Sequence, residues 1–342
     1  MKKIAFFDTK PYDKKGFDDL KEQNDFNIKY IEYRLNPDTA YMAKGCDAVC
    51  AFVNDVISKE TIDILSELGI KIIALRCAGY NNVDFEAALN KVHVVTVPAY
   101  SPHAVAEHAM ALLLAVNRKL HRATHRTRDF NFSLNGLTGF DLFGKTIGVI
   151  GTGKIGQIFI EICKGFGMNV LAYDPYPAKI DVQYVGLDEL FSKSDIISLH
   201  CPLTKDTYHI INEESIGKMK DNVYLINTSR GALIDSEALL KNLKSGKIGG
   251  AALDVYEEES EVFFEDFSNE IIRDDTLAML ISLPNVIITS HQAFLTEEAL
   301  NEIAKVTIEN LNEYFNSQPL KNEICYRCNK ANCEKKANGR CF

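Results

Sequence analysis

Three closely spaced glycines, Gly151, Gly153 and Gly156, constrain this chain more than any other feature. Residues 145–150 before them form a short β-branched run that is typical of a buried strand. Residues 155–166 after them carry apolar side chains at helical intervals. A G-x-G-x-x-G loop between a strand and a helix indicates a site for the phosphates of a dinucleotide. Those phosphates would meet the free N–H groups and the positive end of the helix dipole.

A carboxylate downstream of this loop indicates which dinucleotide is bound. A second strand, 169–174, ends on Asp174, 18 residues after Gly156. The acid that hydrogen-bonds the adenosine ribose is expected about 20 residues beyond the loop. A carboxylate there would repel a 2′-phosphate, so the sequence predicts NAD and not NADP. The alternative is a structural glycine turn beside a surface aspartate. The loop residues predicted to bind the cofactor are Gly151, Thr152, Gly153, Lys154, Ile155 and Gly156.

The composition argues against several other classes of protein. The 342 residues suffice for about two domains with an ample core. The net charge of −9 argues against nucleic acid or an anionic membrane as the main partner. The longest apolar segments are far shorter than the roughly 20 residues of a membrane span, and Lys2 and Lys3 are not followed by a signal-peptide pattern. Five of the nine cysteines are scattered singly, which suits a reducing cytoplasm.

Strand and helix patterns alternate along the chain, which predicts an α/β fold with parallel sheets. The predicted strands are 4–7, 47–53, 72–75, 94–97, 145–150, 169–174, 196–200, 223–227, 250–255 and 286–289. A helix over 59–68 precedes Gly69, and another runs from Ser101 and Pro102, which suit a helix start, to about Leu120. A last helix, 296–314, should cross back to cover the first sheet.

Polar side chains follow three strand ends in the second half of the chain: Arg230, an acid among residues 257–259, and His291. Ligands of open α/β sheets bind at the carboxyl ends of the strands, so these groups should converge near the cofactor. The arginine fork can grip a carboxylate with two hydrogen bonds. The imidazole can exchange a proton near neutral pH, and a neighbouring carboxylate would favour its protonated form. Singly, each residue has an ordinary structural explanation. Together they suit the reduction of a 2-keto acid.

Seven motifs then carry a family resemblance over roughly residues 1–320. They are Leu75–Asp84, Val97–Pro102, Val149–Gly156, Ser198–Leu203, Asn227–Gly231, Asp254–Glu257 and His291–Leu295. With them the chain resembles the D-isomer-specific 2-hydroxyacid dehydrogenases, most of all the fermentative D-lactate dehydrogenases of Gram-negative bacteria. The resemblance implies two Rossmann-like or flavodoxin-like parallel-sheet domains, with the active site in the cleft between them.

The resemblance also implies roles for individual residues. Arg230 would anchor the substrate, Asp174 would bind the ribose, and Glu259 would be the partner of His291. The residues alone leave Glu257, Glu258 and Glu259 open; the family pattern favours the acid five residues after the aspartate. Further substrate contacts would come from Ala78, Gly79, Tyr100 and Phe294. Further cofactor contacts would come from His200, Cys201, Pro202, Thr228, Ser229 and Asp254, beside Arg230 and His291.

By the same implication, residues 1–100 with 297–325 form the substrate domain and residues 101–296 the NAD-binding Rossmann domain. The chain would form homodimers or homotetramers and catalyse the reversible, NADH-dependent reduction of pyruvate to D-lactate. Two alternatives stay open: a bulkier 2-keto acid, such as phenylpyruvate or 2-ketoisocaproate, and a non-enzymatic NAD-sensing corepressor with the same fold. The aromatic rings of Phe52 and Phe294 would confine a small substrate, which favours pyruvate.

Residues 326–342 form a Cys-rich basic tail to which the resemblance assigns no function. Zinc in structural sites has four ligands in tetrahedral geometry. The thiolates of Cys325, Cys328, Cys333 and Cys341 could provide them. An iron–sulfur cluster and free thiols are the alternatives. Elsewhere, His200 and Cys201 are adjacent at a strand end and should point apart, which argues against a nucleophilic pair. A basic cluster in 121–128 is interpreted as a solvated helix face or a subunit contact.

Overall fold

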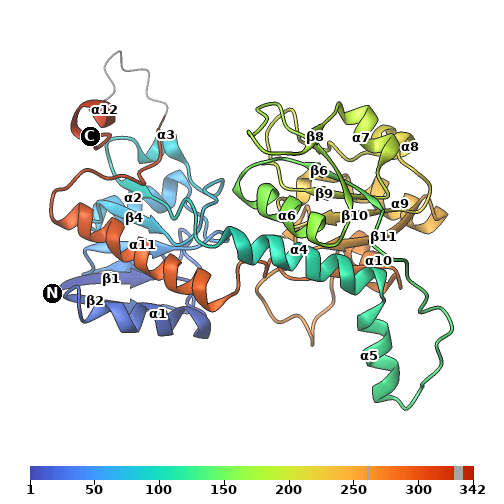
Figure 1. Ribbon diagram of the computed structural model, residues 1–342. Coiled ribbons are helices and arrows are strands. Elements are labelled where there is room, and N and C mark those ends of the chain that lie inside the picture. The colour runs from blue at the N-terminus through green and yellow to red at the C-terminus, as the bar shows by residue number, and fades with distance from the viewer. Residues whose placement is uncertain (260–261, 327–333) are drawn as a thin grey trace. The chain divides into compact units, whose positions relative to one another are not determined.

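The computed structural model describes residues 1–259, 262–326 and 334–342. It divides into two compact units, of which the first contains both the blue start and the red end of the chain in Figure 1. The first unit comprises Met1–Ser101 and Thr296–Phe342, and the second comprises Pro102–Leu295. Among the described helices, none has the length and apolar character that a membrane crossing requires.

The first unit is built on a five-stranded parallel sheet of order β2-β1-β3-β4-β5. Its strands are β1 Lys2–Phe6, β2 Phe26–Tyr30, β3 Ala48–Ala51, β4 Ile72–Leu75 and β5 His93–Val95. Its helices are α1 Pro11–Lys21, η1 Ala40–Ala43, α2 Lys59–Glu67, α3 Phe85–Ala88, α11 Glu297–Phe315 and α12 Glu334–Asn338. The long helix α11 returns from the end of the chain and buries Ile308 and Leu311 against Ile4 and Phe6 of β1.

The second unit is a seven-stranded parallel sheet of order β12-β11-β10-β9-β6-β7-β8. Its strands are β6 Thr146–Ile150, β7 Asn169–Tyr173, β8 Gln183–Tyr184, β9 Ile196–Leu199, β10 Val223–Asn227, β11 Ile248–Leu253 and β12 Val286–Ile288. Its helices are α4 Pro102–Asn117, α5 Leu120–Arg128, α6 Lys154–Gly165, α7 Leu187–Lys193, α8 Glu213–Lys218, η2 Gly231–Leu233, α9 Ser236–Ser245 and α10 Asp275–Ser282. The strand order reverses beside β6, as in doubly wound dinucleotide-binding sheets.

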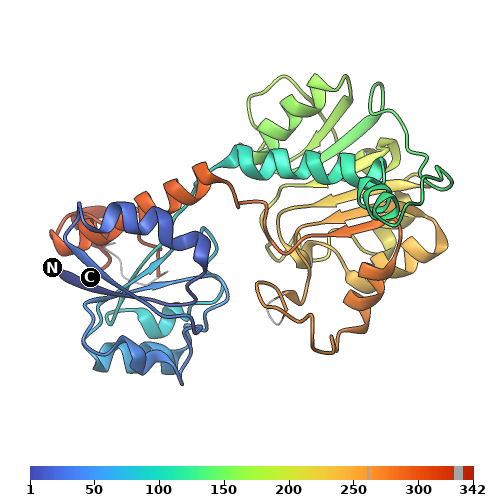
Figure 2. The same ribbon diagram turned by 90° about the horizontal axis from the view of Figure 1, so that it is seen from below.

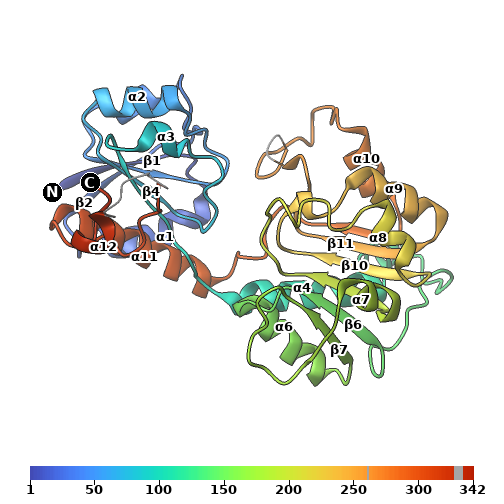
Figure 3. The same cartoon turned by 90° about the horizontal axis from the view of Figure 1, so that it is seen from above.

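Helices cover both faces of this second sheet, as Figures 2 and 3 show from two sides. Ile147 and Val149 of β6 point to the layer that contains α4 and α6. Ile150 of the same strand points to the layer that contains α7 to α10. Because both faces are buried, the strands are continuously apolar, which is why they could be recognised in the sequence.

The predicted α/β class with two parallel sheets is confirmed, and the differences are local. The predicted helix from residue 102 to about Leu120 ends at Asn117, because Lys119 takes a left-handed backbone with φ of +51°. The chain then turns into α5, which has no buried residue. The strand β2 was not predicted from the sequence, because its polar residues obscure its apolar pattern.

The chain end packs against the edge strand β5 of the first unit. Ile324 N–H donates to the carbonyl of Val94 at 3.0 Å, and Glu323 forms an antiparallel bridge with Val95. The buried Glu323 carboxylate lies 2.6 Å from Nδ1 of His93 and accepts the N–H of Cys341 at 2.8 Å. Of the described tail residues, Tyr326 and Cys341 are buried in this unit.

Replacing His93 by Leu should destabilise the first unit, because it leaves the Glu323 carboxylate buried without its imidazole partner. Leaving a buried hydrogen-bonding group without its partner costs about 1–3 kcal/mol of unfolding free energy. Urea denaturation of His93→Leu measures this loss. His93→Gln keeps an N–H donor and should recover part of the stability. Equal midpoints for the wild type and His93→Leu would contradict the pairing.

Candidate active site

The three glycines of the β6–α6 loop have three different physical reasons to be glycine. Gly151 follows β6 with φ of +99°, a backbone conformation that side chains rarely adopt. A Cβ on Gly156 would lie 2.1 Å from the Gly151 carbonyl oxygen, so only glycine lets α6 start so close to the loop. A Cβ on Gly153 would meet nothing within 4 Å. The first and third glycines thus shape the loop, and the second leaves open space at the start of α6.

The predicted ribose acid, Asp174, follows β7 and is half-buried. Its carboxylate accepts hydrogen bonds from the backbone N–H of Thr152 at 2.7 Å and of Tyr176 at 2.8 Å. The Thr152 hydroxyl also donates to it, at 3.1 Å. Asp174 therefore fixes the glycine loop as well as placing a negative charge beside it. Lys154 and Ile155, also predicted for the cofactor, form the first residues of α6.

The histidine and one of the three acids form a direct pair. Nδ1 of His291 lies 2.9 Å from the Glu259 carboxylate, whose second oxygen accepts the N–H of Tyr256 at 2.9 Å. Glu257 bonds Nε2 of His209 instead, at 2.6 Å, and Glu258 is exposed. The geometry singles out Glu259 as the partner of His291, a choice that three consecutive acids left open. His209 was missed, because nothing local links it to a residue 48 positions away.

The loop that carries His291 is fixed by the buried carboxylate of Asp254, at the end of β11. This carboxylate accepts the N–H groups of Gln292 at 2.9 Å and Ala293 at 2.8 Å and the Thr289 hydroxyl at 2.5 Å. The Asp254 carbonyl accepts the N–H of His291 at 2.7 Å. Asp254 is thus the residue that holds the loop in place, a role that the sequence did not indicate.

Arg230 lies in a braced turn directly after β10. The Asn227 side chain donates to the Arg230 carbonyl at 2.8 Å, and the Ser229 hydroxyl donates to the Cys201 carbonyl at 2.6 Å. A Cβ on the next residue, Gly231, would lie 2.0 Å from the Tyr256 carbonyl oxygen. The turn of Arg230 and the segment that carries Glu259 are therefore in close backbone contact.

Of the residues predicted to contact the cofactor, His200, Cys201, Pro202 and Thr228 are uncharged. Burial lowers the pKa of His200 to about 3 and raises the pKa of the Cys201 thiol to about 11. An uncharged imidazole and an undissociated thiol do not form a nucleophilic pair. The carbonyl of Pro202 accepts the Thr207 hydroxyl at 2.7 Å. Thr228 is buried, and its hydroxyl oxygen has no hydrogen-bond partner in the described structure.

The predicted substrate residues occur in both units. In the first, Ala78 and Gly79 are half-buried after β4, and the Gly79 carbonyl accepts the Cys77 thiol at 3.2 Å. Tyr100 is half-buried, and Phe52 is buried. In the second unit, Phe294 is buried three residues after His291. Whether these residues contact a substrate stays a prediction.

The zinc hypothesis concerns four cysteines, of which two are described. Cys325 is exposed, and Cys341 is buried, with its thiol pKa raised to about 12 by burial. Cys328 and Cys333 lie outside the described residues. Across the part of the chain that the structure describes, no group of three or more potential metal ligands is present. Zinc in the tail stays a prediction for metal analysis of the purified protein.

Comparison with known proteins decides the family. The model of the D-isomer specific 2-hydroxyacid dehydrogenase NAD binding domain matches residues 110–293. The D-lactate dehydrogenase of Escherichia coli (strain K12) is 51% identical over 327 residues, which cover 94% of this chain and 99% of that protein. The chain belongs to the D-isomer specific 2-hydroxyacid dehydrogenase family.

Solved structures of this dehydrogenase family share the whole fold. The pyruvate reductase of Chlamydomonas reinhardtii matches with a TM-score of 0.90 and 45% identity, over 94% of this chain and 98% of that one. The NAD-complexed D-isomer specific 2-hydroxyacid dehydrogenase of Lactobacillus delbrueckii ssp. bulgaricus matches with a TM-score of 0.80 and 32% identity, over 94% and 100%. The family comparison supports the predicted NAD-dependent oxidoreductase.

Replacing Gly156 by Ala should disrupt the dinucleotide loop of this dehydrogenase, because the methyl group would overlap the Gly151 carbonyl. Overpacking of this kind costs about 1–3 kcal/mol, and displacement of α6 should weaken NADH binding. Urea denaturation and fluorescence titration with NADH measure the two effects. Gly165→Ala, at an open position of the same helix, should leave NADH binding unchanged and should not lower the stability. If both variants bound NADH equally well, the close contact would not matter.

Proposed function

We propose that this chain catalyses the NADH-dependent reduction of pyruvate to D-lactate. The observation that carries the proposal is the His291–Glu259 pair at 2.9 Å, on a segment in backbone contact with the turn of Arg230. The 51% identical relative from Escherichia coli is a D-lactate dehydrogenase, and the Chlamydomonas relative is a pyruvate reductase. An acid/base imidazole and a guanidinium anchor are what reduction of a 2-keto acid requires.

In the proposed mechanism, each side chain of the trio has one task. The Arg230 guanidinium binds the substrate carboxylate with two hydrogen bonds. The bond from Nδ1 of His291 to Glu259 leaves Nε2 to donate a proton to the developing alkoxide oxygen. Glu259 favours the protonated imidazole and holds the ring in orientation. The reverse reaction uses the same groups, with His291 accepting the proton.

The residues of the second unit fit the NAD that this reaction needs. NADH, when bound, supplies the hydride for the keto carbon. The start of α6 offers free N–H groups beside Gly153, where the backbone is open to a pyrophosphate. Asp174 offers its carboxylate beside the loop, and Thr228 offers a buried hydroxyl that has no partner in the described residues. Neutral His200 and Cys201 add no charge next to a nicotinamide ring.

The substrate side of the proposal concerns Ala78, Gly79, Tyr100 and Phe294. The Ala78–Gly79 backbone and Tyr100 would bind the carboxylate, and Phe294 would provide an apolar wall. A bulkier 2-keto acid is the second candidate substrate, and the buried rings of Phe52 and Phe294 favour the smaller one. In this role the chain would regenerate NAD in the cytoplasm of a fermenting cell.

Turnover with a panel of keto acids tests this function, with chiral analysis of the product. We expect pyruvate to have the highest kcat/KM and the product to be D-lactate.

His291→Gln should lower kcat by ~10²–10⁴-fold while NADH still binds, because the proton donor is lost. Glu259→Gln should also lower kcat, since the imidazole loses the carboxylate that holds it in orientation. Near-normal turnover of His291→Gln would refute the assignment.

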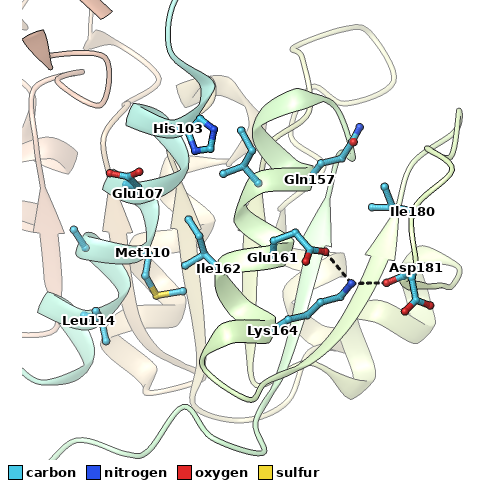
Figure 4. Close-up of a pocket in the computed structure, with 12 residues that line it drawn as sticks. His103, Glu107, Met110, Leu114, Gln157, Glu161, Ile162, Lys164, Ile180 and Asp181 are labelled. Atoms are coloured by element: carbon cyan, nitrogen blue, oxygen red, sulfur yellow. Dashed lines mark hydrogen bonds and ion pairs between the residues drawn. The ribbon is translucent and has the colours of Figure 1, made fainter. Parts of the chain in front are cut away.

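We further propose that the second unit pairs with a second copy of the chain. A groove of about 1090 Å³ lies between α4 and α6, with Met110, Leu114 and Ile162 along its wall (Figure 4). Large apolar side chains are exposed in the segment between these two helices: Phe130, Phe132, Leu134 and Phe143. Each is at least 72% exposed, and large apolar side chains exposed in this number indicate an interface between proteins.

Replacing Ala111 by Arg should weaken this pairing, because Ala111 is exposed in the groove and a charged side chain would occupy it. Sedimentation velocity should show dimers or tetramers of the wild type and smaller species of Ala111→Arg. Glu237→Arg, at an exposed position of α9, serves as the control with the same new side chain. An unchanged sedimentation coefficient for Ala111→Arg would remove the groove from the interface.

A further inference from the structure

His291 has a strained backbone, and this strain needs a physical explanation. Its φ of +52° lies in the left-handed region, which costs free energy for a residue other than glycine. Such a conformation persists only where surrounding contacts over-determine it. Its bond to Glu259 places the imidazole but does not fix the backbone of residues 289–293.

The contacts that fix this backbone converge on the Asp254 carboxylate. One of its oxygens accepts from the Thr289 hydroxyl and the Gln292 N–H, and the other accepts from the Ala293 N–H. The carboxylate is fully buried, with 0% exposure. A buried carboxylate is stable only when donors or positive charge compensate for the water it has lost.

One side chain from a different element completes this arrangement. Nε2 of His108, on α4, lies 3.3 Å from the Asp254 carboxylate and 3.2 Å from the Thr289 hydroxyl oxygen. Because the Thr289 hydroxyl donates to Asp254, its oxygen can accept from His108. A proton on Nε2 of His108 therefore serves both oxygens at once. The described structure places no other imidazole, lysine or arginine nitrogen within ion-pair distance of Asp254.

We propose that His108 is a positioning residue for His291, acting through Asp254 and Thr289. His108 supplies the donor from α4 that keeps the Asp254 carboxylate in place, and Asp254 in turn holds the loop that carries His291 in its left-handed conformation. This inference rests on the proposed role of His291 as the acid/base group. The contact of His108 with Asp254 and Thr289 directs the His291 ring at the substrate. It contributes less to the folding of the chain.

Kinetics of His108→Leu and His108→Gln test this inference in the full-length enzyme with NADH and the keto acid that the wild type reduces best. His108→Leu removes the donor, and we expect kcat to fall ~10–100-fold, because small displacements of a catalytic group are that costly. The KM for the keto acid should change less than 3-fold, since Arg230 is untouched. His108→Gln keeps an N–H donor near the position of Nε2 and should recover at least half of the lost rate, on a logarithmic scale.

The matched control is His93→Leu, which removes a buried imidazole from a carboxylate in the other unit. It should lower the midpoint of thermal unfolding without lowering kcat more than 2-fold at a temperature where it is folded. A His108→Leu enzyme with the kcat of the wild type would overturn the inference. Equal loss of rate in the Leu and Gln variants would overturn it too. Failure of the proposed function would look different, since the wild type itself would then reduce no keto acid.

Discussion

The parallel direction of every strand pair in the second unit is the constraint on which the candidate site depends. Because β6, β7 and β9 to β12 all run the same way, their carboxyl ends lie along one edge of the sheet. The glycine loop, Asp174, the Arg230 turn, the acidic segment and the His291 loop each follow one of these ends. Residues that are more than a hundred positions apart in the chain are thus brought to a common edge by topology alone.

Backbone contacts then refine what topology brings together. Gly156 packs on the carbonyl of Gly151, and Gly231 packs on the carbonyl of Tyr256, in both cases closer than any side chain would allow. The first contact sets the start of α6 against the dinucleotide loop. The second sets the Arg230 turn against the segment that carries Glu259. Because Gly156 and Gly231 have no side chain, these two close contacts can form. They position the cofactor side and the catalytic side of the proposed site.

The sequence predicted what local patterns encode and missed what long-range pairing decides. The apolar strands and the glycine loop have strong local patterns, and the polar residues at strand ends could be named from them. The choice of Glu259 could not be made from chemistry, since three consecutive acids are alike. The direction of each side chain decides it, and Glu257 points to His209 instead. The role of His108 could not be predicted either, because a histidine within an apolar helix gives no local indication of its partner.

The end of the chain pairs with the edge of a sheet, a role that its sequence does not indicate. The strand β5 is the edge of the first sheet, and an unpaired edge offers its N–H and C=O groups to other chains. Residues 322–324 cover it: Thr96 N–H donates to Asn322, and Ile324 N–H donates to Val94. The paired His93 and Glu323, with the Phe342 ring stacked 4.3 Å from the imidazole, then anchor the cover. The end of the chain is thus held on this sheet by backbone pairing and by the contact of His93 with Glu323, and not by a periodic apolar pattern.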